Sequence, residues 1–307
     1  SVCFTLSVWD LSVALANGDP VIIARNALEL PLLPARDQVR LINTVPSAIN
    51  ALQRDGQIPP SVRIINLAGE PLKQSLVDVL YQQSTVEHVF DLYGPSEDTT
   101  YSTWTRREAD GRANIGRPLK HTASYLLDAE LQPVPQGIAA ELYLAGAGTT
   151  RGYLGRPAMT AEEYVPNPFA SHGERLYRTG DLTRYQADGT LQYVGRIDHQ
   201  VKIRGLRIVL GGFDARLYDH SWLLDAAVSV QQGPNGKYLV GYLVAAVADP
   251  GQNECLEHIK QRLRAELPEY MVPLHWQWLA RLPLNANGKL DRRALPLIEI
   301  GQQQRDD

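Results

Sequence analysis

Residues 86–98 read VEHVFDLYGPSED and combine a strand-like segment with the turn that ends it. The stretch from Val86 to Leu92 is short and mostly apolar, which is typical of a strand buried in a sheet. Gly94-Pro95 then breaks the strand. In open α/β sheets, ligands bind beyond the carboxyl ends of the strands. The polar side chains of this turn are therefore candidates for a binding site.

The segments before this strand alternate between helical and extended patterns. The spacing of apolar residues predicts helices over Asp37 to Asn50 and over Lys73 to Gln83. Val62 to Leu67 reads as another short buried strand. Alternation of this kind, which continues to about residue 105, predicts a parallel sheet covered by helices.

From about residue 113 to 197 the pattern changes to short strands separated by Gly, Pro and Asp-Gly turns, as at Asp188-Gly189. This pattern predicts an antiparallel sheet or barrel. After Asp198 the chain predicts a compact α+β unit of about 100 residues. Its expected elements are a hairpin over Val201 to Val209, a helix over Phe213 to His220, strands over Ala226 to Val230 and Tyr238 to Val247, and a helix over Glu254 to Glu266.

The composition is that of a soluble globular protein, with 44% hydrophobic and 21% charged residues among 307. A chain of this length is expected to form more than one domain. The net charge of −4 gives no basic surface, so we expect no nucleic-acid partner. Cys3 and Cys255 lie far apart, which argues against a disulfide framework and fits a reducing, cytoplasmic compartment.

Other common classes of site find no support in the sequence. The seven histidines show no metal-ligand spacing, so we expect no zinc site. No stretch approaches the roughly 18–20 apolar residues that span a bilayer, so we expect no membrane association. The chain begins at Ser1 without an initiator Met or a signal peptide, and we expect that it is part of a longer protein.

Three further motifs follow in order: YRTGDL at 177–182, GRIDHQVKIRG at 195–205 and NGKLDR at 287–292. With residues 91–98, 140–154 and 267–273, they resemble the adenylate-forming superfamily, specifically the adenylation domain of a nonribosomal peptide synthetase. The resemblance implies an α/β fold. Residues 1–197 would be the C-terminal portion of the large domain, with a parallel sheet, helices and an antiparallel sheet or barrel. Residues 198–300 would form the small, mobile α+β C-terminal domain, and residues 301–307 a linker.

The resemblance implies an ATP and Mg²⁺ site at the turn after the first motif's strand. Tyr93 would pack on adenine, Ser96 would contact the α-phosphate and Glu97 would bind Mg²⁺. The Gly94 turn would let the backbone approach a phosphate. Asp91 stands where the family usually has Asn, and its carboxylate can still accept a hydrogen bond from an adenine amino group.

The later motifs complete this expected site. The resemblance assigns Asp181 to the ribose diol and Arg196 to the ribose and phosphate, for which a planar guanidinium is suited. Lys289 would be the catalytic residue, since its point charge can neutralise charge that develops at the α-phosphate. Asp198 would be the hinge of the small domain. The hairpin around Gly205 would approach the phosphopantetheine arm of a carrier protein.

Several residues resemble the lining of the family's acid pocket, and Thr5 is the one that departs from it. The family usually has Asp there, which pairs with the substrate α-ammonium, and Thr cannot supply this charge. The substrate is then a hydroxy or keto acid, or the pocket is inactive, or the residue was altered. The bulk of Trp9 and Tyr101 predicts a small cavity for an acid of glycine or alanine size. The full set is Thr5, Leu6, Trp9, Asn43, Asn66, Ala68, Gly69, Leu92, Thr100 and Tyr101.

Two features favour reduced activity. The superfamily's Ser/Thr/Gly-rich phosphate loop would lie before residue 1, and nothing in the chain replaces it, so the isolated fragment should be poorly active or inactive. Val209 and Gly212 stand where acids are common in the family, which favours a decayed domain.

The function implied by the resemblance is ATP-dependent activation of a small amino, hydroxy or keto acid as acyl-AMP. The acyl group would then pass to the phosphopantetheine thiol of a peptidyl carrier protein, in antibiotic or siderophore biosynthesis. The carrier protein and a condensation domain would belong to the same polypeptide. Two alternatives stay open: a degenerate, non-catalytic adenylation domain that acts as a scaffold, and an acyl-CoA ligase.

Overall fold

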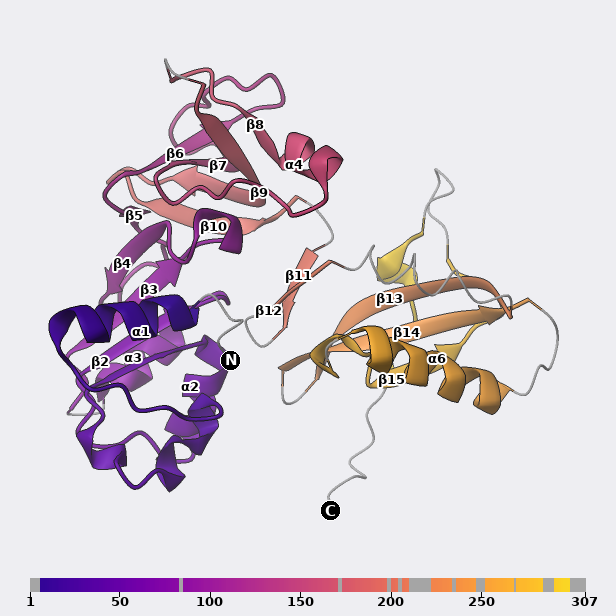
Figure 1. The fold of residues 1–307 in the computed structure, drawn as a ribbon, viewed down its shortest axis with the longest axis horizontal. Helices are drawn as coiled ribbons and strands as arrows, with labels where there is room; N and C mark the ends of the chain where they lie inside the picture. The colour runs from indigo at the N-terminus through magenta and orange to yellow at the C-terminus, as the bar shows by residue number, and fades with distance from the viewer. Residues whose placement is uncertain are drawn as a thin grey trace. The chain divides into compact units, whose positions relative to one another are not determined.

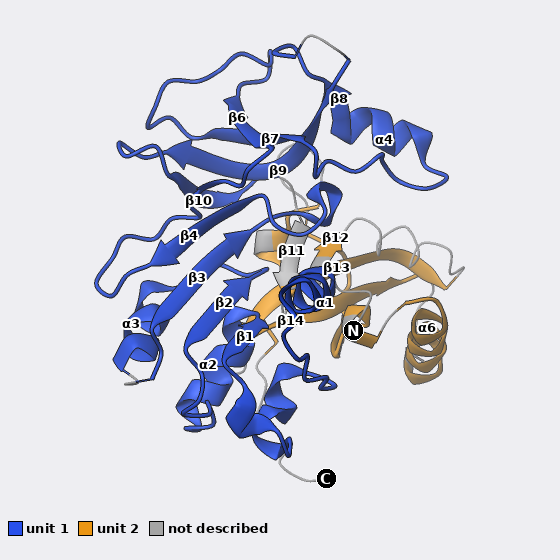
Figure 2. Ribbon diagram, turned by 60° about the vertical axis from the view of Figure 1, so that its left-hand side comes forward, with its two compact units in different colours: residues 1–198 blue, residues 199–307 orange. Residues whose placement is uncertain are grey.

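The computed structural model describes ten segments of the chain, which divide into two compact units of residues 1–198 and 199–307 (Figure 2). None of the helices in these segments is long and apolar enough to cross a membrane. The described segments are 6–82, 85–170, 173–197, 200–203, 206–209, 222–233, 236–246, 252–267, 269–283 and 290–298.

The first unit begins with helix α1 (Leu6–Asn17), the short 3-10 helices η1 (Ala27–Leu32) and η2 (Arg36–Gln38), and a five-stranded sheet (Figure 1). The first three strands run parallel, and the last two are antiparallel. Helices α2 (Pro46–Arg54) and α3 (Gln74–Gln82) connect the parallel strands. The strands in sheet order are β1 (Leu41–Thr44), β2 (Ile64–Ala68), β3 (His88–Tyr93), β4 (Thr103–Arg107) and β5 (Arg117–Pro118).

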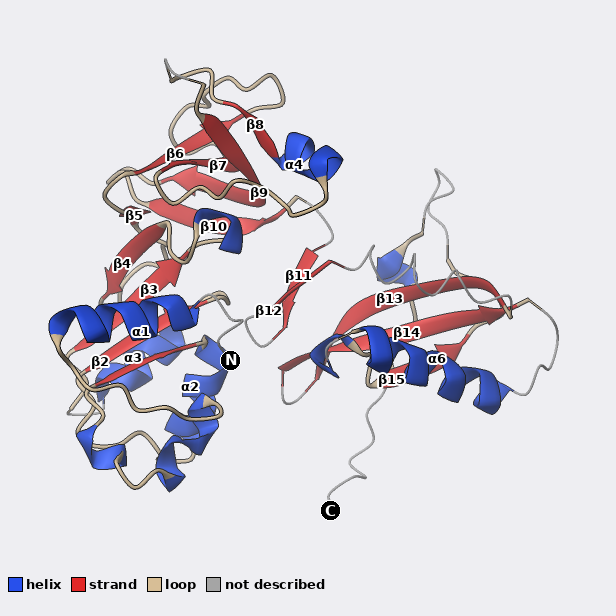
Figure 3. Ribbon diagram, viewed as in Figure 1, coloured by secondary structure: helices blue, strands red, loops and turns tan. Residues whose placement is uncertain are grey.

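The two faces of this sheet have different neighbours because strand side chains alternate in direction. Helices α2 and α3 pack on one face through Ile49, Leu52, Val77 and Leu80, which join one core with Ile65, Leu67 and Val89. On the other face, Leu92 packs with Leu6 and Trp9 of α1. Figure 3 shows the helices around this sheet. The predicted parallel sheet with covering helices is confirmed.

The prediction of one helix over Asp37 to Asn50 is wrong. Strand β1 occupies Leu41–Thr44 and pairs with β2, and α2 starts only at Pro46. Proline lacks the N–H that a helix interior needs, but it is favoured at the first helical position. Pro46 therefore starts a new helix and leaves the preceding residues to the sheet. The helix predicted over Lys73 to Gln83 corresponds to α3.

The second sheet is antiparallel, as the turn-rich sequence predicted. Strand β8 (Tyr164–Pro166) adds to it by pairing with β9, after the short helix α4 (Pro157–Glu163). Tyr93, the last residue of β3, packs in the same core as Leu142, Leu144 and Leu191 of this sheet. The two sheets therefore meet at the carboxyl end of β3. The main strands in sheet order are β10 (Leu191–Arg196), β9 (Arg175–Tyr185), β7 (Ala140–Gly146) and β6 (Thr122–Leu127).

The second unit is α+β, as predicted. Strands β11 (Gln200–Ile203) and β12 (Leu206–Val209) form the expected hairpin. Helix α6 (Gln252–Glu266) packs Ile259 and Leu263 against a three-stranded sheet. That sheet contains β13 (Leu223–Gly233), β14 (Gly236–Ala245) and β15 (His275–Trp278), and 3-10 helices lie at η4 (Glu269–Met271) and η5 (Arg292–Ala294). The helix predicted over 213–220, Gly212 and the tail 301–307 lie outside the described residues.

Two glycines in the first unit test how closely its strands approach. Gly116 has φ +80°, and a Cβ there would lie 1.8 Å from the backbone oxygen of Trp104. Gly137 has a similar φ of +85°, but a Cβ there would meet nothing within 4 Å. Gly137→Ala should cost only the left-handed backbone conformation, about 1–2 kcal/mol of unfolding free energy. Gly116→Ala should cost roughly 1–3 kcal/mol more, because the overlap forces the strands apart. Urea unfolding measures both losses, and equal losses would contradict the close packing of the strands at Gly116.

Candidate active site

The carboxylate of Asp181 lies where β3, β9 and β10 come together, and it is 2% exposed. The hydroxyl of Tyr93 donates to its Oδ2 at 2.5 Å, and the guanidinium of Arg196 donates to its Oδ1 at 2.7 Å. The ion pair follows from the sheet register, because Asp181 and Arg196 are opposite each other in β9 and β10. We call Tyr93, Asp181 and Arg196 the Asp181 clamp.

Thr179 completes the clamp from two residues away. Its hydroxyl accepts a hydrogen bond from the backbone N–H of Asp181 at 3.0 Å, and its carbonyl accepts one from Arg196 at 3.0 Å. Burial raises the pKa of Tyr93 well above its ordinary value, and the negative charge of Asp181 raises it further. Tyr93 therefore stays protonated and acts as a donor. The clamp brings together three residues that the sequence assigned separately to the nucleotide.

The turn after β3 is held against the loop that follows β7. Asp98, at the end of η3 (Ser96–Asp98), is 1% exposed and accepts hydrogen bonds from Ser102 at 2.6 Å and Thr149 at 3.2 Å. The backbone at Gly94 is so close to its neighbours that a Cβ there would lie 2.7 Å from Cα of Tyr101. These contacts fix the turn and leave Ser96 exposed at its start.

Glu97 lies in the same turn and is oriented by Tyr153. The hydroxyl of Tyr153 donates to its Oε1 at 2.6 Å, and the backbone N–H of Thr150 donates to its carbonyl at 2.8 Å. Burial, followed by the bond to Glu97, raises the pKa of Tyr153 far above its ordinary value, so this residue also remains a donor. Mg²⁺ commonly binds through one or two carboxylates together with substrate phosphates. A single oriented carboxylate fits that mode of binding.

Within the described segments, no three His, Cys, Asp or Glu side chains gather in a way that would hold a metal ion.

Asp91 points away from this turn, toward α3. The guanidinium of Arg107 donates to its Oδ2 at 2.8 Å, and both side chains are almost fully buried. Arg107 also donates to the carbonyl of Leu72 at 3.3 Å and to the amide oxygen of Gln74 at 2.7 Å. Asp91 thus has a partner that the sequence motifs did not predict.

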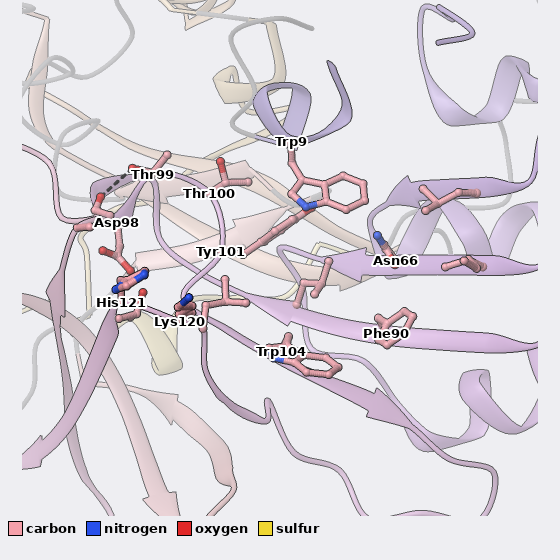
Figure 4. A pocket seen from close by; sticks show the side chains of 17 residues that line it. Trp9, Asn66, Phe90, Asp98, Thr99, Thr100, Tyr101, Trp104, Lys120 and His121 are labelled. Carbon is pink, nitrogen blue, oxygen red and sulfur yellow. Dashed lines mark hydrogen bonds between the residues drawn. The ribbon is translucent and has the colours of Figure 1, made fainter. Parts of the chain in front are cut away.

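A cavity of about 690 Å³ lies on the other face of the sheet (Figure 4). Five of the predicted pocket residues line it: Trp9, Asn66, Leu92, Thr100 and Tyr101. Asn43 bonds the hydroxyl of Tyr101, and Leu6 and Ala68 pack in one cluster with Tyr101. Gly69 has φ +82° at the end of β2 and is not among the described residues that line the cavity.

The cavity extends well past Trp9 and Tyr101. Phe90 and Trp104 line it along the sheet, and Lys120 and His121 line it beside Asp98 (Figure 4). Its volume therefore gives no support to the prediction of a small cavity. Thr5, Asp198, Gly205 and Lys289 lie outside the described residues.

Residues 1–154 match the family of AMP-binding enzymes, and residues 213–289 match the AMP-binding enzyme C-terminal domain. The chain belongs to the AMP-binding enzyme family. This membership confirms the resemblance found in the sequence and implies the use of ATP.

This AMP-binding enzyme is similar to two curated relatives and one solved structure that belong to peptide synthetases. Both relatives are subunits of the linear gramicidin synthase of Brevibacillus parabrevis, one 52% identical over 306 residues and the other 48% identical over 307. The matches cover 98% and 99% of this chain but 6% of each relative. The structure of holo-PA1221, an NRPS protein containing adenylation and PCP domains bound to a vinylsulfonamide inhibitor, superposes with a TM-score of 0.82 at 28% identity. That match covers 96% of this chain and 51% of PA1221.

Three residues of the AMP-binding enzyme's site could not be identified from the motifs. Arg107 and Tyr153 each bond a predicted residue, and Asp10 bonds Asn43 at 2.6 Å. The strand register, which is known only from the structure, accounts for Arg107. Asp91 pairs with Thr105 across β3 and β4, so a charged residue two positions after Thr105 falls on the same buried face.

The buried pair of Asp91 and Arg107 predicts a dependence of stability on pH. Burial raises the pKa of Asp91 to about 7, although Arg107 opposes the rise. In the unfolded chain the pKa of Asp91 is about 4. Between about pH 4 and pH 7 the carboxyl group of Asp91 is therefore more fully protonated in the folded AMP-binding enzyme than in the unfolded chain. Its contribution to stability is therefore present at low pH and is lost as the pH rises through that window. Asp91→Asn should remove this loss in urea unfolding measured across the window.

Asp188 provides a control because its pKa is shifted in the opposite direction from that of Asp91. Its pKa is lowered, first by the hydrogen bond from the Thr190 side chain. Its contribution is present above the unfolded pKa and is lost as the pH falls, so Asp188→Asn should change the profile in the other direction. Identical pH profiles for the unaltered enzyme and Asp91→Asn would show that Asp91 does not titrate in this range.

Proposed function

We propose that this chain is the adenylating part of a nonribosomal peptide synthetase. It would activate a small carboxylic acid with ATP as acyl-AMP and transfer the acyl group to the phosphopantetheine thiol of a peptidyl carrier protein. The observation that carries the proposal is the Asp181 clamp, since it gathers three motif residues from three strands at the edge where α/β sheets bind ligands.

The clamp supports a nucleotide site in which the binding of the ribose by Asp181 is coupled to the packing of Tyr93 on the adenine. A carboxylate has about four lone-pair sites, so Asp181 can accept from a ribose diol while Arg196 keeps one oxygen. The carboxylate is 3% exposed in the clamp, and Tyr93 covers its second oxygen. The ribose therefore has to displace the Tyr93 hydroxyl, and this movement would present the Tyr93 ring to the adenine.

The turn from Gly94 to Glu97 would receive the phosphates. Ser96 is exposed at its start, and Tyr153 orients the carboxylate of Glu97 for Mg²⁺. When bound, Mg²⁺ neutralises phosphate charge and polarises the phosphoryl oxygens. The assignment of Asp91 to the adenine amino group stays a prediction that this geometry does not favour, because the buried carboxylate is paired with Arg107 on the side of α3.

The chemistry needs a cation at the reacting atoms, and Lys289 would supply it. The carboxylate oxygen of the acid would attack the α-phosphorus, and the bond to pyrophosphate would break. In the second step the carrier thiolate would attack the acyl carbon and release AMP. The small domain would turn about Asp198 between the two steps, and the hairpin around Gly205 would then face the pantetheine arm.

The relatives support the proposed partners. PA1221 contains adenylation and PCP domains, and the gramicidin synthase subunits are far longer than this chain. We propose a peptidyl carrier protein and a condensation domain in the same polypeptide, in a pathway that makes an antibiotic or a siderophore.

A non-catalytic scaffold is the second candidate, because Thr5, Val209 and Gly212 depart from the family's usual residues. The Asp181 clamp and the oriented Glu97 oppose it. An acyl-CoA ligase shares the nucleotide residues, and it differs in passing the acyl group to free coenzyme A.

Pyrophosphate exchange with the intact synthetase separates these candidates. We expect exchange with at least one member of a panel of amino, hydroxy and keto acids, and a loss of about 100-fold or more for Lys289→Ala. Transfer of the product to a carrier protein but not to coenzyme A excludes the ligase. Silence of the folded protein across the panel would favour the scaffold. The isolated 307-residue chain should exchange poorly, and a rate equal to that of the intact protein would contradict this expectation.

A pair of variants tests the coupling inside the clamp. Asp181→Asn should raise the KM for ATP about 10- to 100-fold, because the ribose loses a charged acceptor. Tyr93→Phe keeps the ring and removes the hydroxyl that covers Asp181, so its KM for ATP should not rise. Thermal unfolding of both variants controls for damage to the fold. A KM that rises equally in both variants would show that the hydroxyl is not displaced.

A further inference from the structure

Three polar residues from separate elements form a hydrogen-bonded relay behind the cavity. The hydroxyl of Tyr101 donates to Oδ1 of Asn43 at 2.9 Å, and Nδ2 of Asn43 donates to Oδ1 of Asp10 at 2.6 Å. Asp10 belongs to α1, Asn43 to β1, and Tyr101 to the segment before β4. We call these three residues the Asp10 relay.

The carboxylate at one end sets the direction of every bond in the relay. A carboxylate only accepts, so the amide of Asn43 must turn its NH₂ group toward Asp10 and its carbonyl toward Tyr101. The carbonyl in turn obliges the hydroxyl of Tyr101 to donate. The phenol oxygen is then left with its lone pairs as an acceptor, and no donor from the described residues forms a hydrogen bond to it.

Tyr101 is the residue of the relay that reaches the cavity. It lines the cavity beside Trp9, whose ring meets it edge-on at a centroid distance of 6.2 Å (Figure 4). The pKa of Tyr101 is raised, first by burial and in addition by the charge of Asp10. The negative field of the carboxylate therefore reaches the phenol.

We propose that the Asp10 relay makes the hydroxyl oxygen of Tyr101 the acceptor for a protonated amino group of the acid substrate, with Asp10 as the source of the negative charge that Thr5 cannot supply. The inference rests on the proposed function, because the acid must occupy this cavity. Among the alternatives that Thr5 left open, it selects an amino acid over a keto acid. Asp10 and Asn43 act through Tyr101 and are positioning residues.

The other charged groups in the wall of the cavity fit this role less well. Asp98 is a carboxylate, but its two oxygens already accept from Ser102 and Thr149. Lys120 is cationic and would repel an ammonium. The sheet side of the cavity is mainly apolar, with Leu41, Ile64 and Phe90. An ammonium beside that surface needs a nearby negative charge, because an unpaired charge is costly away from water.

The test uses pyrophosphate exchange by the intact synthetase with four acids that share one side chain. They carry an amino group, a hydroxyl, a keto oxygen or only hydrogen next to the carboxylate. The unaltered protein should prefer the amino acid. Tyr101→Phe should raise the KM for the amino acid about 10- to 100-fold, while the KM values for the unsubstituted acid and for ATP stay the same. Asp10→Asn keeps the shape and removes the charge, so it should shift the KM in the same direction by less.

Tyr125→Phe is the matched control, because Tyr125 lies in β6 of the second sheet and stacks on Phe169, from the segment after β8, at a centroid distance of 4.8 Å. It should leave all four KM values unchanged. A merely structural relay would instead raise the KM for every acid and for ATP together, which would overturn the inference. Sensitivity of the amino-acid KM to Asp98→Asn but not to Tyr101→Phe would also overturn it, because the ammonium would then belong to Asp98.

The outcomes also separate the inference from the proposed function. Exchange that prefers the keto or the unsubstituted acid would overturn the inference and leave adenylation intact. Absence of exchange with every acid in the unaltered, folded protein would overturn both.

Discussion

The buried carboxylate of Asp181 constrains both the fold and the site of this AMP-binding enzyme. A charge that is 2% exposed must be paired, and removal of one partner of such a pair typically costs about 3–5 kcal/mol. Tyr93 reaches Asp181 from the first sheet, and Arg196 reaches it from the second. The bond from Tyr93 therefore joins the two sheets, and together with the bond from Arg196 it holds the residues that we propose for the nucleotide. A nucleotide that displaced the hydroxyl of Tyr93 from Asp181 would break a hydrogen bond between the two sheets.

A second buried acid near the same strand serves a different purpose. Asp91 and Tyr93 both face the helix side of β3, but Asp91 is paired with Arg107 near the start of α3. Leu92 points the other way, into the cavity. Because side chains alternate along β3, the ion pair of Asp91 lies on one face and the cavity wall on the other, while Tyr93 at the end of the strand belongs to the Asp181 clamp.

Much of this architecture could be predicted from the sequence. The strand and turn at residues 86–98, the antiparallel region and the hairpin after residue 200 all carry local patterns, and the structure confirms them. The prediction of one helix over Asp37 to Asn50 was wrong because the spacing of apolar residues does not show that Pro46 starts a new helix. Five predicted pocket residues line one cavity. Their positions could be predicted because the position of a residue in a strand or turn fixes the side of the sheet on which its side chain lies.

The partners of these residues could not be predicted. The hydrogen-bonded residues are far apart in the sequence: 33 positions separate Asp10 from Asn43, 16 separate Asp91 from Arg107, and 56 separate Glu97 from Tyr153. Such pairs depend on strand register and loop packing, which no local pattern contains. The same limit applies to Asp181 and Arg196, whose individual roles the motifs indicated but whose contact follows from the pairing of β9 with β10.

The proposed nucleotide site requires that the ribose displaces the hydroxyl of Tyr93 from Asp181. A crystal structure of this AMP-binding enzyme with AMP would reveal whether this exchange of partners occurs. We expect both ribose hydroxyls to bond the carboxylate of Asp181 and the hydroxyl of Tyr93 to have left it. A nucleotide bound elsewhere, with the bond between Tyr93 and Asp181 unbroken, would refute the proposed site.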